Sequence, residues 1–386
     1  MRIPAIRVLI SYVTAGTGHR RAAEAIAEAV RQHLPHAQVD CVDLLAYTPA
    51  WFAWSYPRLY RSLVQRWSPL WGWGYELIDR PWVFRCVQPI RRRWNRLMGR
   101  RLLRRLRDQP PDVLVATHFF PADLFASAKQ AGVLKARLVV VITDLFPHRV
   151  WFAQPTDAFV VGSSPTRDLC RQRGLVADRV HLLGIPVNPS FTQPRNREAT
   201  LRALGLAPDR RTVLIAGGGM GVGPIAELVH QLLVMDPDRA QRLQLIVVCG
   251  DNVRLRRSLE GLRQQARLPI RVFGFVETMA KLMQVSDLLV TKAGGLTITE
   301  ALATGLPLII CSVIPGQEQL NARYVVSHGA AIMALRVPEV IDAIQRLLDD
   351  PATVCAMQER ARALAFPHAA DHIVERLILP LAHETA

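Results

Sequence analysis

Apolar residues in the first half of the chain occur either in short unbroken runs or at helical spacing. An apolar, β-branched run occupies residues 6–13, and helical spacing follows it from residue 22 to residue 34. Three more runs typical of buried strands come next, with a helical pattern over 122–131 between the first two: DVLVATH, ARLVVVITD and DAFVVGS. Strand, helix and strand at this spacing imply parallel pairing with right-handed crossovers. We therefore predict a doubly wound α/β domain.

The alternation restarts after TQPRNREA, a polar and turn-rich stretch that is typical of an interdomain linker. A helical pattern follows nearly every one of the five later apolar runs: RTVLIAGGG, LQLIVVCG, IRVFGFV, DLLVTKAGG and LPLIICS. A chain of 386 residues is also too long for one ordinary core. The predicted fold class is α/β, with two doubly wound, Rossmann-like domains over 1–190 and 191–366. A last helix, within 367–386, is free to pack back on the first domain.

Composition indicates a folded protein that attracts a polyanion. Half of the residues are hydrophobic and only 21% are charged, which excludes a disordered chain. The formal net charge of +16 favours a nucleic acid, an anionic membrane or a phosphorylated substrate as a partner. Much of this charge lies in residues 51–107, which hold fourteen arginines, two acidic residues (Glu76 and Asp79) and seven of the eight tryptophans.

The same segment contains the pattern of a cationic amphipathic helix. Between Arg91 and Arg107, arginines fill most positions around five apolar residues at helical spacing: Trp94, Leu97, Met98, Leu102 and Leu106. Such a helix lies in a membrane interface with its apolar face down, and the neighbouring tryptophans suit the headgroup layer. The alternatives are an arginine-rich helix packed on the first domain and a nucleic-acid patch. Because no nucleic-acid motif accompanies the charge, we expect an anionic membrane surface as the partner of 51–107 and no nucleic acid.

The cysteines and the apolar stretches argue against a zinc protein, a disulfide-rich protein and a membrane-spanning protein. The six cysteines are scattered, with no CxxC pair and no histidine at metal-ligand spacing, so the sequence predicts neither a zinc site nor a disulfide framework. A reducing, cytoplasmic setting is the default for such a chain. The sequence opens without a signal-peptide pattern, and no apolar stretch reaches the roughly 18 residues that span a bilayer. Any membrane contact is therefore expected at the surface.

One histidine lies where an α/β sheet binds ligands. In the stretch SYVTAGTGHRR, His19 follows Gly16 and Gly18, at the end of a predicted strand and the start of a predicted helix. Ligands of open α/β sheets bind at this edge, and a helix N-terminus offers free N–H groups to an anion. The alternative is that the glycines only make a tight turn and that His19 is a polar residue of the first helical turn.

The second half of the chain has two glycine loops, each between a strand and a helix. The first, GGGMGVG (217–223), lacks the Lys-Ser/Thr of a P-loop, which disfavours phosphoryl transfer. A dinucleotide site has an acidic residue at the end of the next strand, roughly 20 residues on, but here that strand comes later in the sequence. The second, Gly294 and Gly295, precedes Glu300, which either accepts the hydroxyls of a ribose or simply favours the positive end of its helix. Two loops suited to anions and one carboxylate predict a nucleoside diphosphate site. The polar residues of PGQEQLNA suit a sugar, although an ordinary solvated loop has the same composition.

Eight segments, in the same order along the chain, resemble the monogalactosyldiacylglycerol synthase family of GT-B, family-28-like glycosyltransferases, which includes bacterial processive diacylglycerol glucosyltransferases. They are GTGHRRAAEAI, ATHFFPADL, ITDLFPHRVW, LLGIPVNPSF, GGGMGVGP, FGFVETMAKLM, SDLLVTKAGGLTITEALATGLPLI and PGQEQLNA. The chain is more distantly similar to the N-acetylglucosaminyltransferase of peptidoglycan synthesis. The resemblance covers nearly the whole chain.

This resemblance implies a GT-B fold in which an N-terminal acceptor and membrane-binding domain faces a C-terminal UDP-sugar domain across a cleft. The implied activity is inverting transfer of glucose or galactose from a UDP-sugar to diacylglycerol, which gives a β-glycosyldiacylglycerol. One alternative is transfer of N-acetylglucosamine or another sugar from UDP to a polyprenyl-linked or other lipid acceptor. Another is a catalytically silent protein that binds a nucleotide sugar or nucleic acid. For the enzyme, we expect a peripheral location on the cytoplasmic face of the cell membrane.

The resemblance also assigns roles in the first domain. His19 is implied at the catalytic centre, as the base that activates or orients the acceptor hydroxyl, and Gly18 adjoins the substrate. A histidine that titrates near neutrality suits that task. Asp144, also expected to be catalytic, and His148 are implied to line the acceptor side.

In the second domain, the resemblance implies a UDP site and a sugar site. The UDP site consists of Gly217, Gly218, Gly219 and Gly221 in the first loop, Phe275 and Val276 beside the uracil, Gly294 and Gly295 at the diphosphate, and Glu300 at the ribose. Gln317, Glu318 and Asn321 are expected to bind the donor sugar. Met220 stands where the plant-type pattern tends to have an acidic residue, which leaves the substrate preference open. No cofactor and no metal are expected, because helix N-termini stabilise a leaving diphosphate and no Asp-x-Asp motif occurs.

Overall fold

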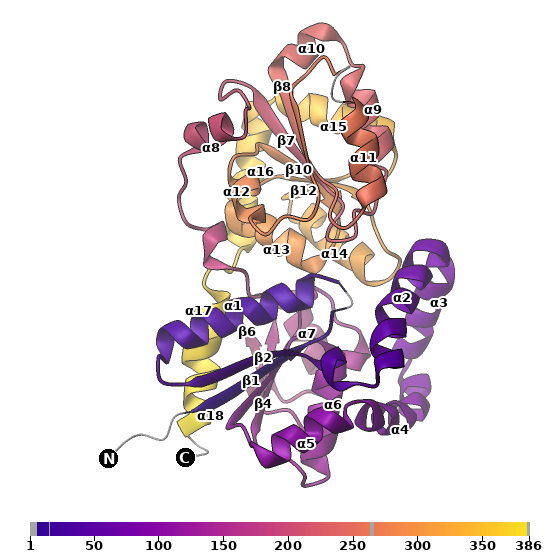
Figure 1. The fold of residues 1–386 in the computed structure, drawn as a ribbon, viewed down its shortest axis with the longest axis vertical. Coiled ribbons are helices and arrows are strands. Elements are labelled where there is room, and N and C mark those ends of the chain that lie inside the picture. Colours follow the sequence, from indigo (N-terminus) through magenta and orange to yellow (C-terminus); the bar gives the residue numbers. More distant parts are fainter. Residues whose placement is uncertain (1–5, 15, 263–265, 384–386) are drawn as a thin grey trace. The chain divides into compact units, whose positions relative to one another are not determined.

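A computed structural model describes residues 6–14, 16–262 and 266–383 of the chain. These residues form two compact units (Figure 1). The first unit consists of Met1–Asn188, Ile314–Gln317 and His368–Ala386, and the second of Pro189–Val313 and Glu318–Pro367. Residues 1–5 and 384–386, which the sequence analysis assigned to the first domain and the last helix, lie outside the described residues.

The first unit is built on a six-stranded parallel sheet in the order β2-β1-β3-β4-β5-β6. Its strands are β1 (Arg7–Tyr12), β2 (Gln38–Asp43), β3 (Val113–Ala116), β4 (Arg137–Val141), β5 (Ala158–Val161) and β6 (Val180–Leu182). Successive residues of the central strands contribute to opposite cores, as Val113 and Leu114 do in β3. Both faces of the sheet are therefore covered, which explains why its central strands, β1, β3, β4 and β5, are apolar runs in the sequence.

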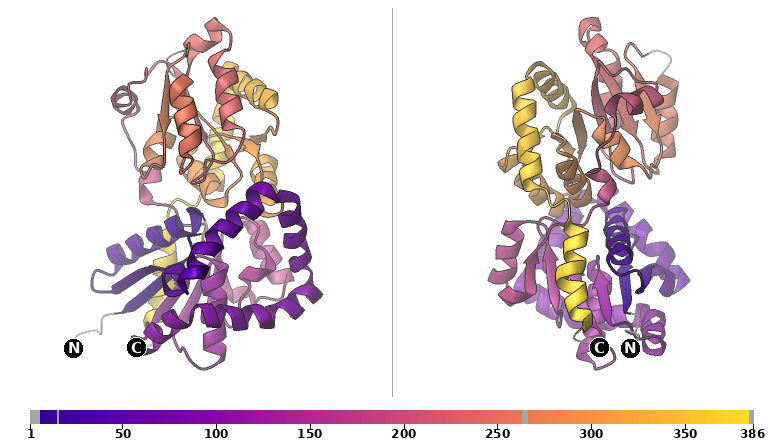
Figure 2. Two further views of the ribbon diagram at one scale, coloured as in Figure 1. Left: turned by 45° about the vertical axis from the view of Figure 1, so that its right-hand side comes forward. Right: turned by 90° about the vertical axis from the view of Figure 1, so that its left-hand side faces the viewer.

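Helices of the first unit cover the two faces. They are α1 (Gly18–His33), α2 (Ala50–Arg66), α3 (Ser68–Asp79), α4 (Pro81–Met98), α5 (Arg100–Asp108), α6 (Phe119–Gln130), α7 (Ser164–Gln172), α17 (Ala369–Ile373) and α18 (Leu379–His383). A π-helical turn, Val374–Ile378, joins α17 to α18. These C-terminal elements share one core with α1 and the sheet (Figure 2), and His33 Nε2 lies 3.1 Å from Asp371 Oδ1.

The arginine-rich stretch after residue 90 differs from the single amphipathic helix that the sequence predicted. It is divided between α4 and α5 at Gly99, where a Cβ atom would lie 2.4 Å from Leu124 Cδ2 of α6. Met98, Leu102 and Leu106 are buried in the core of the first unit. The prediction of one continuous membrane-facing stripe is therefore wrong, because α6 and the core cover its second half.

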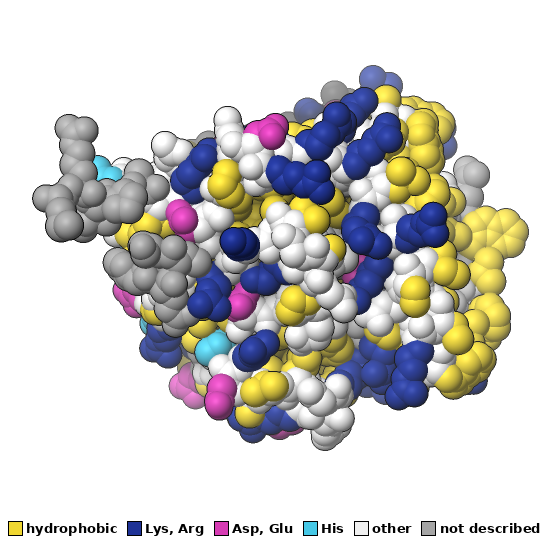
Figure 3. Space-filling model, turned by 90° about the horizontal axis from the view of Figure 1, so that it is seen from below, with side chains coloured by type: hydrophobic (Ala, Val, Ile, Leu, Met, Phe, Trp, Pro, Cys, Tyr) yellow, Lys and Arg dark blue, Asp and Glu magenta, His cyan; other side chains and the backbone are white. Residues whose placement is uncertain are grey.

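Exposed apolar side chains gather instead on α2, α3 and α4, and at Trp67, which lies between α2 and α3. Six tryptophans make up this aromatic patch, as we call it: Trp51, Trp54, Trp67, Trp73, Trp82 and Trp94. Seen from below, the molecule carries many Lys and Arg side chains and few acidic ones (Figure 3). Hydrophobic side chains line the right-hand edge of that view, the side on which Figure 1 shows these helices. None of the described helices is long and apolar enough to cross a membrane.

The second unit has a six-stranded parallel sheet in the order β12-β11-β10-β7-β8-β9. Its strands are β7 (Arg211–Ala216), β8 (Leu243–Val248), β9 (Ile270–Phe273), β10 (Leu288–Lys292), β11 (Leu308–Ser312) and β12 (Ala331–Met333). Its helices are α8 (Arg197–Ala203), α9 (Ile225–Leu233), α10 (Pro237–Arg242), α11 (Val253–Leu262), α12 (Met279–Gln284), α13 (Gly295–Thr304), α14 (Gln317–Ser327, whose first residue belongs to the first unit), α15 (Val337–Asp349) and α16 (Pro351–Leu364). The predicted linker TQPRNREA is not wholly a linker, because Asn196 caps α8 by accepting from Ala199 N at 2.9 Å.

Both sheets confirm the predicted class of doubly wound α/β folds. In each, the strand order reverses its direction between two neighbouring strands, β1 and β3 in the first unit and β7 and β10 in the second. Open α/β sheets bind ligands at such a reversal, beyond the carboxyl ends of the strands.

Candidate functional site

His19 lies at the reversal point of the first sheet. It is the second residue of α1, shortly after β1, and β1 pairs with β3. Thr117 and His118 follow the last residue of β3, and Thr143 comes two residues after β4. Three neighbouring strands thus bring these four side chains to one edge of the sheet. The sequence analysis predicted this place for His19 and did not single out Thr117, His118 or Thr143.

Hydrogen bonds fix the ring of His19. Its Nδ1 lies 2.9 Å from the carbonyl oxygen of Thr117 and 2.8 Å from Thr143 Oγ1. Because a carbonyl only accepts, Nδ1 of the neutral ring carries the proton and donates it, which leaves the lone pair on Nε2. Thr117 Oγ1 also donates to the backbone oxygen of His19 at 2.9 Å. The structure therefore supports Nε2 as the basic atom.

Burial keeps this histidine neutral. Burial of the ring lowers the pKa of His19 to about 4. The hydrogen bond to the Thr117 carbonyl raises this pKa, but its effect is smaller than that of burial. The ring of His118 stands edge-on at 4.6 Å between centroids, and burial, with the neighbouring His19, lowers the pKa of His118 as well. His118 Nδ1 accepts from Phe120 N at 3.0 Å. At neutral pH both rings are uncharged, and His19 is in the form that accepts a proton.

Asp144 and His148 lie on the segment that follows β4, and both are buried. Asp144 Oδ2 accepts from Trp151 Nε1 at 3.2 Å, and the Trp151 ring lies 6.0 Å from that of His19. His148 Nδ1 accepts from Val150 N at 3.1 Å, so its Nε2 donates to the Tyr75 carbonyl at 2.8 Å. Burial also lowers the pKa of His148. These bonds give His148 a structural role, and its contact with an acceptor stays a prediction.

The two glycine loops of the second unit lie side by side, because β7 pairs with β10 up to Ala216 and Thr291. The first loop closes on itself through Val222 N, which donates to the Gly217 carbonyl at 3.0 Å. A Cβ atom on Gly217 would lie 2.5 Å from Val222 N. At Gly221, φ is +59° and a Cβ atom would lie 2.1 Å from the Cys249 carbonyl oxygen. The loop therefore requires glycine for both its turn and its close packing.

The second loop forms the start of α13. Gly294 is the N-cap residue and Gly295 the first helical residue, so free N–H groups and the positive end of the helix dipole lie there. Asn321 Nδ2 donates to the Ala293 carbonyl at 3.2 Å and supports the loop. Glu300 lies in the second turn of α13 and is partly exposed.

The other predicted residues lie on further elements. Phe275 and Val276 follow β9, and Phe275 is exposed. Gln317 and Glu318 are consecutive residues at the start of α14, but they belong to different units. Among the described residues, no group of three or more His, Cys, Asp and Glu side chains is arranged to hold a metal ion.

Lys292 is a residue that the sequence analysis missed. It ends β10, and its Nζ forms an ion pair with Glu318 Oε1. A Cβ atom on Gly218 would lie 3.0 Å from Lys292 Cε, and one on Gly294 would lie 3.1 Å from Lys292 Nζ. A positive charge therefore lies between the two glycine loops. The sequence signal was a lysine at the end of an apolar strand, separated by one residue, Ala293, from a glycine pair.

Comparisons with known proteins show the family to which the chain is similar. Residues 19–187 match the family described as monogalactosyldiacylglycerol (MGDG) synthase, and residues 212–373 match the glycosyltransferase family 28 C-terminal domain. The processive diacylglycerol beta-glucosyltransferase of Bacillus cereus (strain AH187) is 31% identical over 287 residues, which are 74% of this chain and 72% of that protein. The protein of the same name from Bacillus thuringiensis (strain Al Hakam) is 30% identical over 287 residues, with the same coverage of both chains.

Solved structures resemble the whole chain in fold. MurG of Acinetobacter baumannii has a TM-score of 0.62 at 18% identity, over 97% of this chain and 99% of that one. MnaA of S. aureus, solved with UDP, has a TM-score of 0.63 at 13% identity, over 97% of both chains. At such low identity these likenesses show the fold alone, and they confirm the predicted GT-B class.

Proposed function

Because the chain belongs to the glycosyltransferase family that contains the MGDG synthases and the processive diacylglycerol β-glucosyltransferases, we propose that it transfers glucose or galactose from a UDP-sugar to diacylglycerol. The observation that carries this proposal is the geometry of His19. Its Nδ1 is held by Thr117 and Thr143, and its Nε2 keeps a lone pair at the ligand-binding edge of the sheet.

His19 Nε2 accepts the proton of the diacylglycerol hydroxyl as that oxygen attacks C1 of the sugar. The bond between C1 and the diphosphate oxygen breaks on the opposite side, so an α-linked donor gives a β-glycoside. A pKa of about 4 makes His19 a weak base before the donor binds. A diphosphate that gains negative charge as it leaves would stabilise the protonated ring. Proton transfer is then easiest when the sugar is leaving UDP.

The second unit supplies the groups that suit the donor. The N–H groups at Gly294 and Gly295, the 217–223 loop and the Lys292 ammonium can together neutralise a diphosphate. Glu300 would bind the ribose hydroxyls, with Phe275 and Val276 beside the uracil. On donor binding, Lys292 would turn from Glu318 to the phosphates, which would release the Glu318 carboxylate for the sugar hydroxyls. Asn321 belongs to the same proposed sugar site, and Gln317, a residue of the first unit, stays a predicted contact of the sugar.

The aromatic patch supports peripheral attachment to an anionic membrane. Six exposed tryptophans on one group of helices suit the headgroup layer, and the arginines of the same helices attract anionic lipids at about 1 kcal/mol each. This surface would bring the first unit to its lipid acceptor. The six cysteines are unpaired, which is in keeping with the cytoplasmic face.

The test is to incubate the protein with diacylglycerol vesicles that contain anionic lipid, and to supply UDP-glucose and UDP-galactose separately. Glycolipid formed from one donor identifies acceptor and sugar together. His19→Ala should abolish the product and keep UDP binding, whereas His36→Ala, an exposed histidine beyond α1, should keep full activity. Full activity of His19→Ala would contradict its role as the base. No product with either sugar would refute diacylglycerol as the acceptor, and a polyprenyl-linked lipid would be tried next.

A further inference from the structure

His118 has a hydrogen-bond donor that the fold does not use. It is the N-cap residue of α6, and its Nδ1 accepts from Phe120 N at 3.0 Å. In the neutral ring, the proton is therefore on Nε2. Within the described part of the chain, no group accepts a hydrogen bond from this Nε2–H. A buried donor without a protein partner is destabilising, and binding of a ligand is one reason for a fold to keep such a group.

The charge state of His118 limits what this donor can bind. The side chain is 2% exposed, and burial, followed by the neighbouring His19, lowers its pKa well below the ordinary value. The ring is therefore uncharged at neutral pH. A neutral donor does not repay the removal of a phosphate or a carboxylate from water, whereas a carbonyl oxygen loses much less on burial. The expected ligand atom is thus a neutral acceptor.

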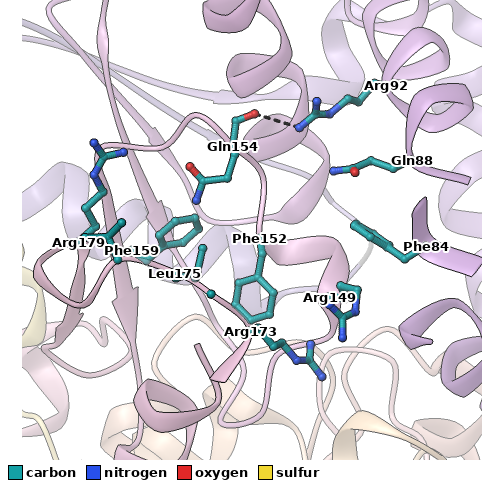
Figure 4. Close-up of a pocket in the computed structure, with 12 residues that line it drawn as sticks. Phe84, Gln88, Arg92, Arg149, Phe152, Gln154, Phe159, Arg173, Leu175 and Arg179 are labelled. Atoms are coloured by element: carbon teal, nitrogen blue, oxygen red, sulfur yellow. Dashed lines mark hydrogen bonds between the residues drawn. The ribbon is translucent and has the colours of Figure 1, made fainter. Parts of the chain in front are cut away.

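The surroundings of His118 also favour a neutral, mainly apolar ligand. The ring of Phe119 lies 4.0 Å from that of His118 between centroids, and the ring of Trp151 lies at 6.4 Å. The first unit has a cavity of about 450 Å³ rich in arginine, but His118 does not line it (Figure 4). The arginines of that cavity are Arg92, Arg149, Arg173 and Arg179. Aromatic side chains, and not guanidinium groups, therefore form the contacts of His118.

His19 and His118 form a pair with opposite hydrogen-bonding roles. Their rings lie edge to face, 4.6 Å apart between centroids and at 85° to each other. His19 Nε2 carries a lone pair, because Nδ1 donates to the Thr117 carbonyl, whereas His118 Nε2 carries a proton. A ligand with a hydroxyl and a carbonyl oxygen close to each other provides a partner for both atoms. A single hydroxyl oxygen suits the pair less well, because accepting from His118 would withdraw electron density from the oxygen that has to attack the sugar.

We propose that His118 is a specificity-determining residue, which donates from Nε2 to the carbonyl oxygen of the acyl ester beside the reacting hydroxyl of the lipid acceptor. This inference rests on the proposed function, because it takes diacylglycerol as the acceptor. In diacylglycerol, an ester is bonded to the carbon next to the one that bears the free hydroxyl. With the hydroxyl at His19 Nε2, the bond from His118 would fix the orientation in which that hydroxyl attacks C1 of the sugar. A lipid without this carbonyl would leave the donor unpaired, and sites of this kind discriminate against such analogues.

The experiment compares diacylglycerol with a dialkylglycerol of equal chain length, in which ethers replace both esters. Both lipids are supplied in the same vesicles, with the UDP-sugar that gives a product. The unchanged protein should use diacylglycerol with a kcat/KM about tenfold higher, which corresponds to one hydrogen bond. This comparison does not depend on any variant.

Variants then assign the preference to His118. His118→Asn keeps an oxygen that can cap Phe120 N, but its side chain is too short to place a donor at the position of Nε2. It should lose most of the preference, with activity falling on diacylglycerol and changing little on the ether lipid. His118→Gln, whose amide nitrogen can reach that position, should regain part of the preference. The matched control is His36→Asn, at an exposed histidine, which should keep the full preference.

Equal use of both lipids by the unchanged protein would overturn the proposal. An equal loss of activity on both lipids in His118→Asn, with the preference kept, would mean that His118 only caps α6 or orients His19, and would overturn it as well. Thermal unfolding and calorimetric UDP binding show whether each variant folds. No transfer to either lipid by the unchanged protein would refute diacylglycerol as the acceptor, and the role of His118 with it. Failure of the proposed function is thus distinct from transfer without an ester preference, which refutes the role of His118 alone.

Discussion

Lys292→Met tests whether the charge between the glycine loops serves the donor or only the fold. Lys292 and Glu318 are 14% and 8% exposed in their side chains, so this ion pair is largely buried. Removing one partner of a buried pair leaves an uncompensated charge, at a cost of about 3 kcal/mol or more. For a unit of this size, that corresponds to a loss of roughly 6 to 12 °C in Tm.

The double variant Lys292→Met/Glu318→Gln removes both charges. It should regain most of the lost Tm, because no unpaired charge stays buried. If Lys292 binds the diphosphate, UDP affinity will not recover. Loss of one charge-assisted hydrogen bond, about 1.5 to 3 kcal/mol, predicts a Kd for UDP roughly 10 to 150 times higher in both variants.

Scanning fluorimetry gives the Tm values, and calorimetric titration gives the UDP affinities. The reasoning about donor binding is refuted if the double variant binds UDP as tightly as the unchanged protein. The reasoning about stability is refuted if Lys292→Met unfolds at the same temperature as the unchanged protein. Since the two readouts respond to different roles of one side chain, either result is interpretable without the other.

Three further predictions concern other parts of the chain. The pKa of His19 is lowered to about 4, so between pH 4 and 6.5 the unfolded chain binds more protons than the folded one at this residue. Tm should fall as pH is lowered through this window, and less so in His19→Gln. Trp54→Ser/Trp73→Ser removes two tryptophans that are each 63% exposed. This double variant should sediment with anionic vesicles at least tenfold less than the unchanged protein, without a lower Tm. Unchanged sedimentation would contradict attachment through the aromatic patch. Gly221→Ala should destabilise the second unit by about 1 to 3 kcal/mol, measured by denaturant titration, and should weaken UDP binding. The control is Gly261→Ala, because no atom lies within 4 Å of the new Cβ there. It should leave the stability unchanged or raise it.

The sequence was sufficient to predict those features that a single segment of the chain determines by itself. The glycine turn before His19, between an apolar run and a helical pattern, placed this histidine at the edge of the sheet where it is found. The apolar runs likewise located the central strands of both sheets, since strands buried on two faces must be apolar throughout. The roles assigned to Gln317, Glu318 and Glu300 stay predictions.

Features that depend on distant segments were missed or misread. Lys292 gains its position from the pairing of β10 with β7 and from Glu318 on another helix. The spacing of Leu102 and Leu106 correctly indicated an apolar helix face, but it did not indicate that the core of the first unit covers that face. His148 is bonded to the Tyr75 carbonyl, a contact between residues 73 positions apart that no local pattern encodes.

The return of the C-terminal helices to the first unit determines when that unit can be completed during synthesis. One face of its sheet, with Val8 and Ile10, is covered by α1 together with Ile373, Leu377 and Ala382. Domains commonly fold in order from the N-terminus while the chain is still on the ribosome. Here the unit that is translated first lacks part of its core until residues 369–382 have emerged. The second unit, which ends at Pro367, is fully translated before that, so the first unit is the later one to reach its final form.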